Sequence, residues 1–148
     1  MKWMLLTVAV LFSGLVIARG GTPENVNNEL AKLNGVWKMV VLQEDGNSPP
    51  DEVVKTMRLV LKDDHWTMLV GAKKVGAGTF SVDPARNIIE RTDLEGNDKG
   101  KTFHGIYELN GDAFKTCWGP ANQELRPTSY ASKKGSHCEL NVLQRVKE

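Results

Sequence analysis

The chain has 148 residues, of which 41% are hydrophobic and 25% are charged, and its formal net charge at pH 7 is +1. This length and composition predict one globular domain with a single core. Because basic and acidic residues are interspersed along the chain, the charge pattern is not that of a protein that binds nucleic acid or an anionic membrane surface, and we expect neither as a partner.

The first twenty residues differ in kind from the rest. Met1 and Lys2 form a short positive start, and an almost uninterrupted apolar run follows from Trp3 to Ile17. The run is short for a hydrocarbon core of roughly 30 Å, and small residues follow it. We predict a signal peptide over residues 1–20 and a periplasmic or extracellular protein with no stable membrane span after cleavage; an uncleaved anchor is the alternative.

A polar stretch follows the leader, and we predict a flexible junction over residues 21–28. From Glu29 to Leu33 two leucines stand three residues apart, and Asn34-Gly35 follows them. This pattern predicts a short helix that ends at the glycine.

From Val36 onward the sequence has runs of Val, Leu, Thr and aromatic residues separated by clusters of Gly, Asp, Asn and Pro. Such a pattern is typical of successive antiparallel strands, and turn sequences such as Asp63-Asp64 and Asn110-Gly111-Asp112 would join neighbouring strands tightly. A short helix is expected to interrupt the strands after Ser48-Pro49-Pro50. The predicted strands are 36–43, 57–62, 65–70, 75–82, 87–92, 102–109, 113–118 and 138–146.

Several of these segments alternate between apolar and polar residues. Met57, Leu59 and Leu61 would face one way while Arg58 and Lys62 face the other, so one face is core and the other is solvent. Closing about eight such strands into a barrel removes the two exposed edges of an open sheet. We therefore predict an all-β fold, a small up-and-down antiparallel barrel with a short N-terminal helix, over residues 29–148.

Several motifs occur in an order that resembles a known family. Gly35-Val36-Trp37 has the Gly-x-Trp form found at the start of the first strand in lipocalins. With Glu44-Asp45-Gly46, Gly78-Thr79-Phe80, the segment 100–109 and Arg126-Pro127-Thr128, it resembles a small lipocalin-like domain family found as many paralogues in planctomycete bacteria. The match extends over about residues 30–147.

The resemblance implies an exported lipocalin-like barrel but no particular ligand. It also implies that Trp37 closes one end of the barrel, stacked against an arginine. Arg126 and Arg145 are the candidates for that partner. The other interpretation of Trp37 is that it lines a ligand pocket.

Cys117 and Cys138 are the only cysteines, and export would place them where a disulfide can persist. Alternation assigns Cys138 to the core face with Leu140 and Val142, but it assigns Cys117 to the opposite face from Phe114. Side chains on opposite faces cannot reach the Cβ separation of about 3.8 Å that a disulfide needs. We therefore expect no Cys117–Cys138 bridge.

The sequence offers no recognisable catalytic or metal motif. The histidines, at positions 65, 104 and 137, form no ligand pair of the usual spacing, and no nucleophile motif is present. Asp93, Glu95 and Asp98 stand among glycines and asparagine, which predicts a solvated loop rather than a calcium site. We expect no metal, no cofactor and no catalytic residue.

Three aromatic residues are candidates for a ligand site. Alternation places Phe80, Tyr107 and Trp118 on the apolar faces of their strands, so we predict a small apolar site inside the barrel mouth. The interior of an eight-stranded barrel is either filled by side chains or holds one small ligand. We expect a non-enzymatic protein that binds a small apolar molecule; the alternatives are a structural or protein-interaction module of the cell envelope with a filled barrel, and an enzyme of unrecognised type.

Overall fold

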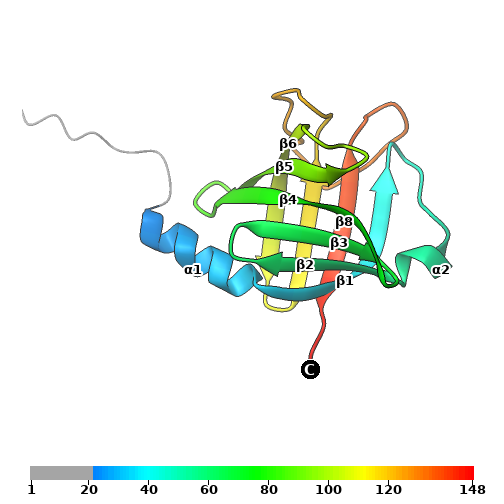
Figure 1. Ribbon diagram of the computed structural model, residues 1–148. Coiled ribbons are helices and arrows are strands. Elements are labelled where there is room, and N and C mark those ends of the chain that lie inside the picture. The colour runs from blue at the N-terminus through cyan, green and yellow to red at the C-terminus, as the bar shows by residue number, and fades with distance from the viewer. Residues whose placement is uncertain (1–21) are drawn as a thin grey trace, which may run out of the picture.

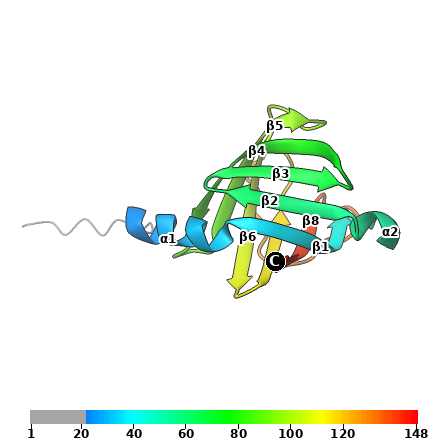
Figure 2. The same ribbon diagram turned by 60° about the horizontal axis from the view of Figure 1, so that its bottom comes forward.

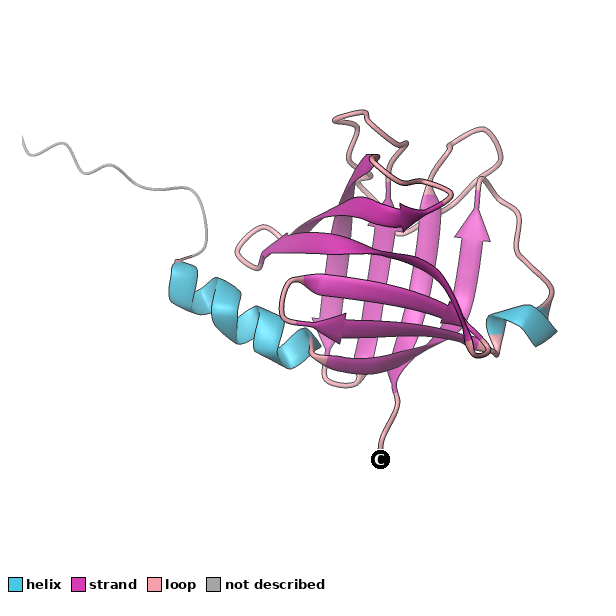
Figure 3. Cartoon of the chain, viewed as in Figure 1, coloured by secondary structure: helices cyan, strands magenta, loops and turns pink. Residues whose placement is uncertain are grey.

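The computed structural model describes residues 22–148, and the predicted signal peptide and its cleavage site lie outside them. Eight antiparallel strands form a closed barrel in which each strand pairs with its sequence neighbours and β8 pairs with β1 (Figure 1, Figure 3). The predicted all-β, up-and-down barrel preceded by a helix is confirmed. The elements are α1 (Pro23–Leu33), β1 (Gly35–Glu44), α2 (Asp51–Val54), β2 (Met57–Lys62), β3 (His65–Val70), β4 (Lys73–Asp83), β5 (Ile88–Gly96), β6 (Thr102–Asn110), β7 (Ala113–Trp118) and β8 (Glu139–Arg145).

The helix α1 begins earlier than predicted, so a flexible junction is wrong from Pro23 onward. The Thr22 side chain accepts a hydrogen bond from the Asn25 amide, and Pro23 occupies the first helical turn, where it loses no hydrogen bond. Glu24 adds a favourable charge at the helix N-terminus. These signals for the start of a helix are present in the sequence, but they lie in a polar segment, which favoured the prediction of a flexible junction.

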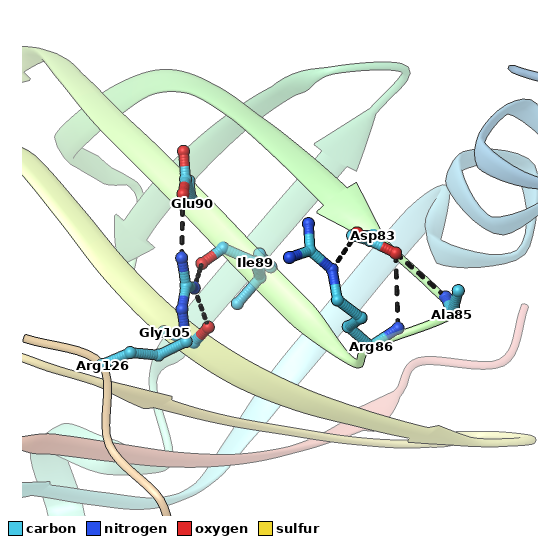
Figure 4. Close-up of polar contacts among 7 residues, drawn as sticks. All are labelled: Asp83, Ala85, Arg86, Ile89, Glu90, Gly105 and Arg126. Carbon is cyan, nitrogen blue, oxygen red and sulfur yellow. Dashed lines mark hydrogen bonds and ion pairs between the residues drawn. The ribbon is translucent and has the colours of Figure 1, made fainter. Parts of the chain in front are cut away.

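Tight turns join most of the strands as predicted, and each relies on a residue that accepts a positive φ. Asp63, Gly71 and Gly111 have φ values of 54°, 60° and 58° in the β2–β3, β3–β4 and β6–β7 turns. The β4–β5 turn is held by Asp83, whose carboxylate accepts hydrogen bonds from the amides of Ala85 and Arg86 (Figure 4). Sequence neighbours are therefore neighbours in the sheet.

Two strands extend by two or more residues beyond a predicted end. β4 begins at Lys73, and β5 continues to Gly96 through residues that we assigned to a solvated loop. Asp93 is part of β5 and is only 5% exposed. The acidic, glycine-containing composition was misleading here because β5 pairs along its length with the long strand β4.

The inward and outward residues of β8 are the reverse of those predicted. Asn141 and Leu143 are buried inside the barrel, whereas Leu140 and Val142 lie on the outer face and are half-buried. Their apolar character misled the assignment because part of this outer face is also covered. The segment 119–138 packs there, where the Ala131 carbonyl accepts from the Cys117 thiol and the Tyr130 ring lies 5.0 Å from Lys115 Nζ.

One end of the barrel, here called the closed end, is sealed by the last turn of α1 and by Trp37. The Trp37 side chain is fully buried, and its Nε1 donates to the Leu33 carbonyl at 2.8 Å. The Arg145 guanidinium lies 4.2 Å from the centre of the Trp37 ring and donates to the carbonyls of Lys32 and Asn34. Figure 2 shows α1 and the C-terminus at this end. Trp37 therefore has the structural role, and its partner is Arg145.

Arg126 is not the partner of Trp37, and its prediction as part of that motif is wrong. Its guanidinium lies on the outer side of the barrel, where Nη1 donates to the carbonyls of Ile89 and Gly105 and Nη2 pairs with Glu90 at 2.9 Å (Figure 4). Glu90 also contacts the His104 ring at 3.0 Å. Arg126 thus fixes the 119–138 segment to β5 and β6.

We expect Arg126→Ala to lower the free energy of unfolding by about 2 kcal/mol, because charge-assisted hydrogen bonds are lost and a carboxylate loses its partner. Limited proteolysis should then cut within residues 119–138 faster than in the unaltered chain. Arg126→Lys keeps the charge but not the planar fork, so it should recover only part of the stability. Unchanged urea unfolding and cleavage in the alanine variant would contradict this role.

Candidate functional site

A cavity of about 50 Å³ lies inside the barrel. It has room for roughly three to five water-sized groups, because one water needs about 10–15 Å³ measured in this way. Most of its lining is apolar, and the polar exceptions are Arg91, Thr116 and Asn141. The apolar lining is formed by Met39, Leu59, Leu61, Trp66, Met68, Phe80, Ile89, Phe114, Trp118 and Leu143.

Inward-facing glycines position the two tryptophan rings of this cavity. A Cβ atom on Gly76 or Gly78 would lie 3.2 Å or 2.8 Å from the Trp66 ring, and one on Gly105 would lie 2.7 Å from the Trp118 ring. The indoles therefore lie directly on the backbones of β4 and β6. A side chain at any of these glycines would push a ring into the cavity.

Arg91 is the charged side chain of the cavity wall, and it projects from the inner face of β5. Its guanidinium carbon lies 4.3 Å from the centre of the Phe103 ring, 4.9 Å from Trp118 and 5.6 Å from Trp66. The side chain is only 15% exposed. Cation–π attraction to three rings offsets part of the cost of removing this charge from water.

Two carboxylates stand beside Arg91. Asp93 Oδ1 lies 3.2 Å from Arg91 Nε, and Glu139 Oε1 lies 3.5 Å from Arg91 Nη1. Burial raises the pKa of Asp93 above its usual range, although the Arg91 charge opposes this shift. When both carboxylates are ionised they exceed the positive charge of Arg91 by one. We call Arg91, Asp93, Glu139 and Asn141 the polar cluster.

Several buried polar atoms around this cluster have no hydrogen-bond partner. The Arg91 Nε and Asp93 Oδ1 atoms are close, but their geometry is not that of a hydrogen bond. Trp66 Nε1 and Asn141 Oδ1 are also unpartnered, and both side chains line the cavity. Buried polar atoms normally have partners, so the unpartnered atoms of Trp66, Arg91 and Asn141, whose side chains line the cavity, are available to a ligand or to water.

A wider groove of about 440 Å³, the mouth groove, opens at the end of the barrel opposite the closed end. Glu139 and Phe103 line the groove and also contact Arg91, which lines the cavity. The polar cluster therefore stands between the groove and the cavity. The other residues of the groove come from loops and strand ends: Glu44, Asp45, Asp98, Lys101, Gly119, Pro120, Ala121, Gln123 and His137.

The three predicted site residues do not lie together. Phe80 and Trp118 line the cavity, but Tyr107 does not. Tyr107 points inward nearer the closed end, where its ring contacts Phe114 edge-on and its hydroxyl donates to Glu29 of α1 at 2.9 Å. Alternation assigned Tyr107 to the correct face, but a period of two cannot give its height along the barrel.

The sequence interpretation missed Arg91, Asp93 and Asn141. A usable signal existed for the first two, because Ile89, Arg91 and Asp93 stand at alternate positions and so share one face of a strand. An inward arginine two residues from an inward aspartate is unusual enough to indicate a site. Asn141 could be found only after the inner face of β8 had been assigned correctly.

The cysteines are both free thiols, but the reason we gave for this is wrong. Cys117 faces outward and pairs with Leu140, an outward residue two positions after Cys138, so the two cysteines are not separated by the sheet. Cys117 is nevertheless fully buried under the 119–138 segment. Burial raises the pKa of its thiol, which makes it a poor nucleophile.

We expect a thiol reagent to modify Cys138 first in the folded protein and Cys117 only after unfolding. Both thiols should react in urea without a reductant, as counted by the mass of the alkylated chain. A chain that unfolds without reductant and takes up no label would contain the disulfide that we exclude.

No helix within residues 22–148 is long and apolar enough to cross a bilayer. Over the same residues, no three His, Cys, Asp or Glu side chains are grouped so that they could hold a metal ion. Comparison of the chain with family profiles, with curated proteins and with solved structures finds no match in any of the three.

Proposed function

We propose that the protein is an exported, non-catalytic binding protein that takes the apolar part of one small molecule into the barrel cavity. The observation that carries this proposal is the union of an apolar cavity with unpartnered polar atoms of Trp66, Arg91 and Asn141 at its wall. Pockets with a mainly apolar lining and a few convergent polar groups are typical of small-molecule sites. The resemblance to lipocalin-like domains also supports a binding role.

The volumes of the cavity and of the mouth groove limit the size of the ligand. A cavity of about 50 Å³ accepts only a short apolar part of a few heavy atoms, whereas the mouth groove of about 440 Å³ accommodates a larger, more polar portion. A long, fully enclosed acyl chain does not fit these two spaces. We therefore expect affinity for short-chain molecules.

The small cavity also supports a second candidate, a protein-interaction module with a filled barrel. In that case the cavity holds water and no small molecule binds. The two candidates differ in a direct test, because only the first predicts saturable binding inside the barrel.

The test is a titration with 1-pentanol, followed by calorimetry and by tryptophan emission, since Trp66 and Trp118 line the cavity. Leu59→Phe should abolish binding by filling the space, whereas Leu109→Phe is a matched control because Leu109 does not line the cavity. We expect saturation in the unaltered chain and in the control. Absence of saturation, or equal binding in both variants, would favour the filled barrel.

Export is a separate part of the proposal and rests on the leader alone. Intact-mass analysis of periplasmic or secreted protein should give an N-terminus near Arg19 or Gly21. An exported protein that still begins at Met1 would show that the leader is not removed.

A further inference from the structure

We propose that the ligand of this cavity carries a protonated amine, which Glu139 and Asn141 bind while the apolar part occupies the cavity and Asp93 adds negative charge nearby. This inference rests on the proposed function and names its ligand class. It depends on the charge of the polar cluster, on the position of an unpartnered acceptor and on the charge of the mouth groove.

The charge of the polar cluster favours a cation. Arg91 is the only positive group within it, and the ionised forms of Asp93 and Glu139 leave one negative charge uncompensated. A bound ammonium would make the cluster neutral. An anion placed against Arg91 would instead meet two carboxylates that already lie 3.2 Å and 3.5 Å from its guanidinium nitrogens, and like charges at such separations repel strongly where water is partly excluded.

Asn141 supplies an acceptor whose direction is fixed. Its Nδ2 donates to Glu139 Oε1 at 2.8 Å and to Thr116 Oγ1 at 3.3 Å, which assigns the amide orientation. The Oδ1 atom is left without a partner on a side chain that is 5% exposed and lines the cavity. An ammonium group has three N–H donors and no acceptor, so it matches the unpartnered Asn141 Oδ1 atom and the neighbouring Glu139 carboxylate.

The mouth groove, which leads to the polar cluster, also carries an excess of negative charge. The mouth groove is lined by the carboxylates of Glu44, Asp45, Asp98 and Glu139, against Lys101 and His137. Lys101 is paired with Asp98 at 2.8 Å, which leaves the remaining carboxylates in excess. A cleft whose lining carries a net negative charge raises the local concentration of cations.

The two unpartnered donors, Arg91 Nε and Trp66 Nε1, do not make the site selective for an anion. Arg91 Nε already lies beside Asp93 Oδ1, and a small rotation would join them. Trp66 Nε1 is a single neutral donor, which an alcohol, an amide or water can satisfy as well as a carboxylate can. Neither donor requires an anion.

The test compares three molecules with the same short chain, n-pentylamine, 1-pentanol and pentanoate, by calorimetry at pH 7. We expect the amine to bind at least about tenfold more tightly than the alcohol, and pentanoate to bind most weakly, because a charge-assisted hydrogen bond exceeds a neutral one by about this factor. Equal affinities for amine and alcohol would overturn the inference and leave the proposed function intact. Tightest binding by pentanoate would also overturn it, and binding by none of the three would end both proposals.

Substitutions in the polar cluster test whether its carboxylates are responsible for amine binding. Glu139→Gln and Asp93→Asn each remove one charge with little change of shape, and each should weaken n-pentylamine binding about tenfold while leaving 1-pentanol binding unchanged. The retained alcohol affinity shows that the barrel is folded. Asp64→Asn is the control, since this exposed carboxylate precedes β3 on the outside and pairs with His65. Amine affinity that survives both substitutions in variants that still bind 1-pentanol would overturn the assignment.

Discussion

Replacing Trp37 with alanine is expected to lower the free energy of unfolding by about 3–5 kcal/mol, the range typical of large aromatic residues removed from a core. The Trp37 ring is fully buried and contacts Phe114 at a centroid distance of 5.4 Å. Its loss would also leave the Leu33 carbonyl without its indole donor and remove the ring that lies against the Arg145 guanidinium. Urea unfolding followed by circular dichroism measures the change.

The matched control is Trp37→Phe. Phenylalanine retains much of the apolar volume and a ring for Arg145, but it has no N–H for the Leu33 carbonyl. We therefore expect a smaller loss, about 1–2 kcal/mol. Similar stability of the alanine variant and the unaltered chain would mean that α1 and Trp37 do not close the barrel.

Replacing Arg91 with methionine is expected to cost about 3 kcal/mol at pH 7, because the substitution leaves Asp93 and Glu139 partly buried without their cation. The effect should depend on pH. Burial already raises the pKa of Asp93, so the folded state binds this proton more tightly than the unfolded chain. Its contribution to stability therefore grows as the pH falls through the raised pKa and is complete below the unfolded value, near 4.

The Arg91→Met variant should accordingly differ less from the unaltered chain at pH 4.5 than at pH 7. The double variant Arg91→Met, Asp93→Asn provides the control. It removes one of the two carboxylate charges that have lost their cation, so it should regain part of the stability at pH 7. A loss of stability that is the same at both pH values would indicate that packing against the aromatic rings, rather than charge, makes Arg91 important.

The barrel could be predicted from the sequence because its signals are local. Turn residues such as Asp63 and Gly111 occur between apolar runs, and period-two alternation fixes an inner and an outer face. The face of β8 was wrong because Leu140 and Val142 are half-buried on the outside, where another segment of the chain packs. Burial by a segment that is distant in sequence cannot be recognised from the local sequence pattern.

The candidate site was harder to predict because it depends on position along the barrel and on pairs far apart in sequence. Tyr107 and Trp118 share an inner face but lie towards opposite ends, and Arg145 rather than Arg126 reaches Trp37. The polar cluster joins β5 to β8. Only the closed barrel brings Arg91 and Glu139 together.

Entry of a ligand at the mouth of the barrel can be followed through the indole N–H resonances of Trp37, Trp66 and Trp118 during a titration with n-pentylamine. Each resonance is assigned from a Trp→Phe variant. Since Trp66 and Trp118 line the cavity and Trp37 seals the closed end, the first two resonances should shift with one saturable affinity while that of Trp37 stays in place. Shifts confined to Trp37, or no saturable shift at Trp66 and Trp118, would show that n-pentylamine does not enter the cavity from the mouth of the barrel.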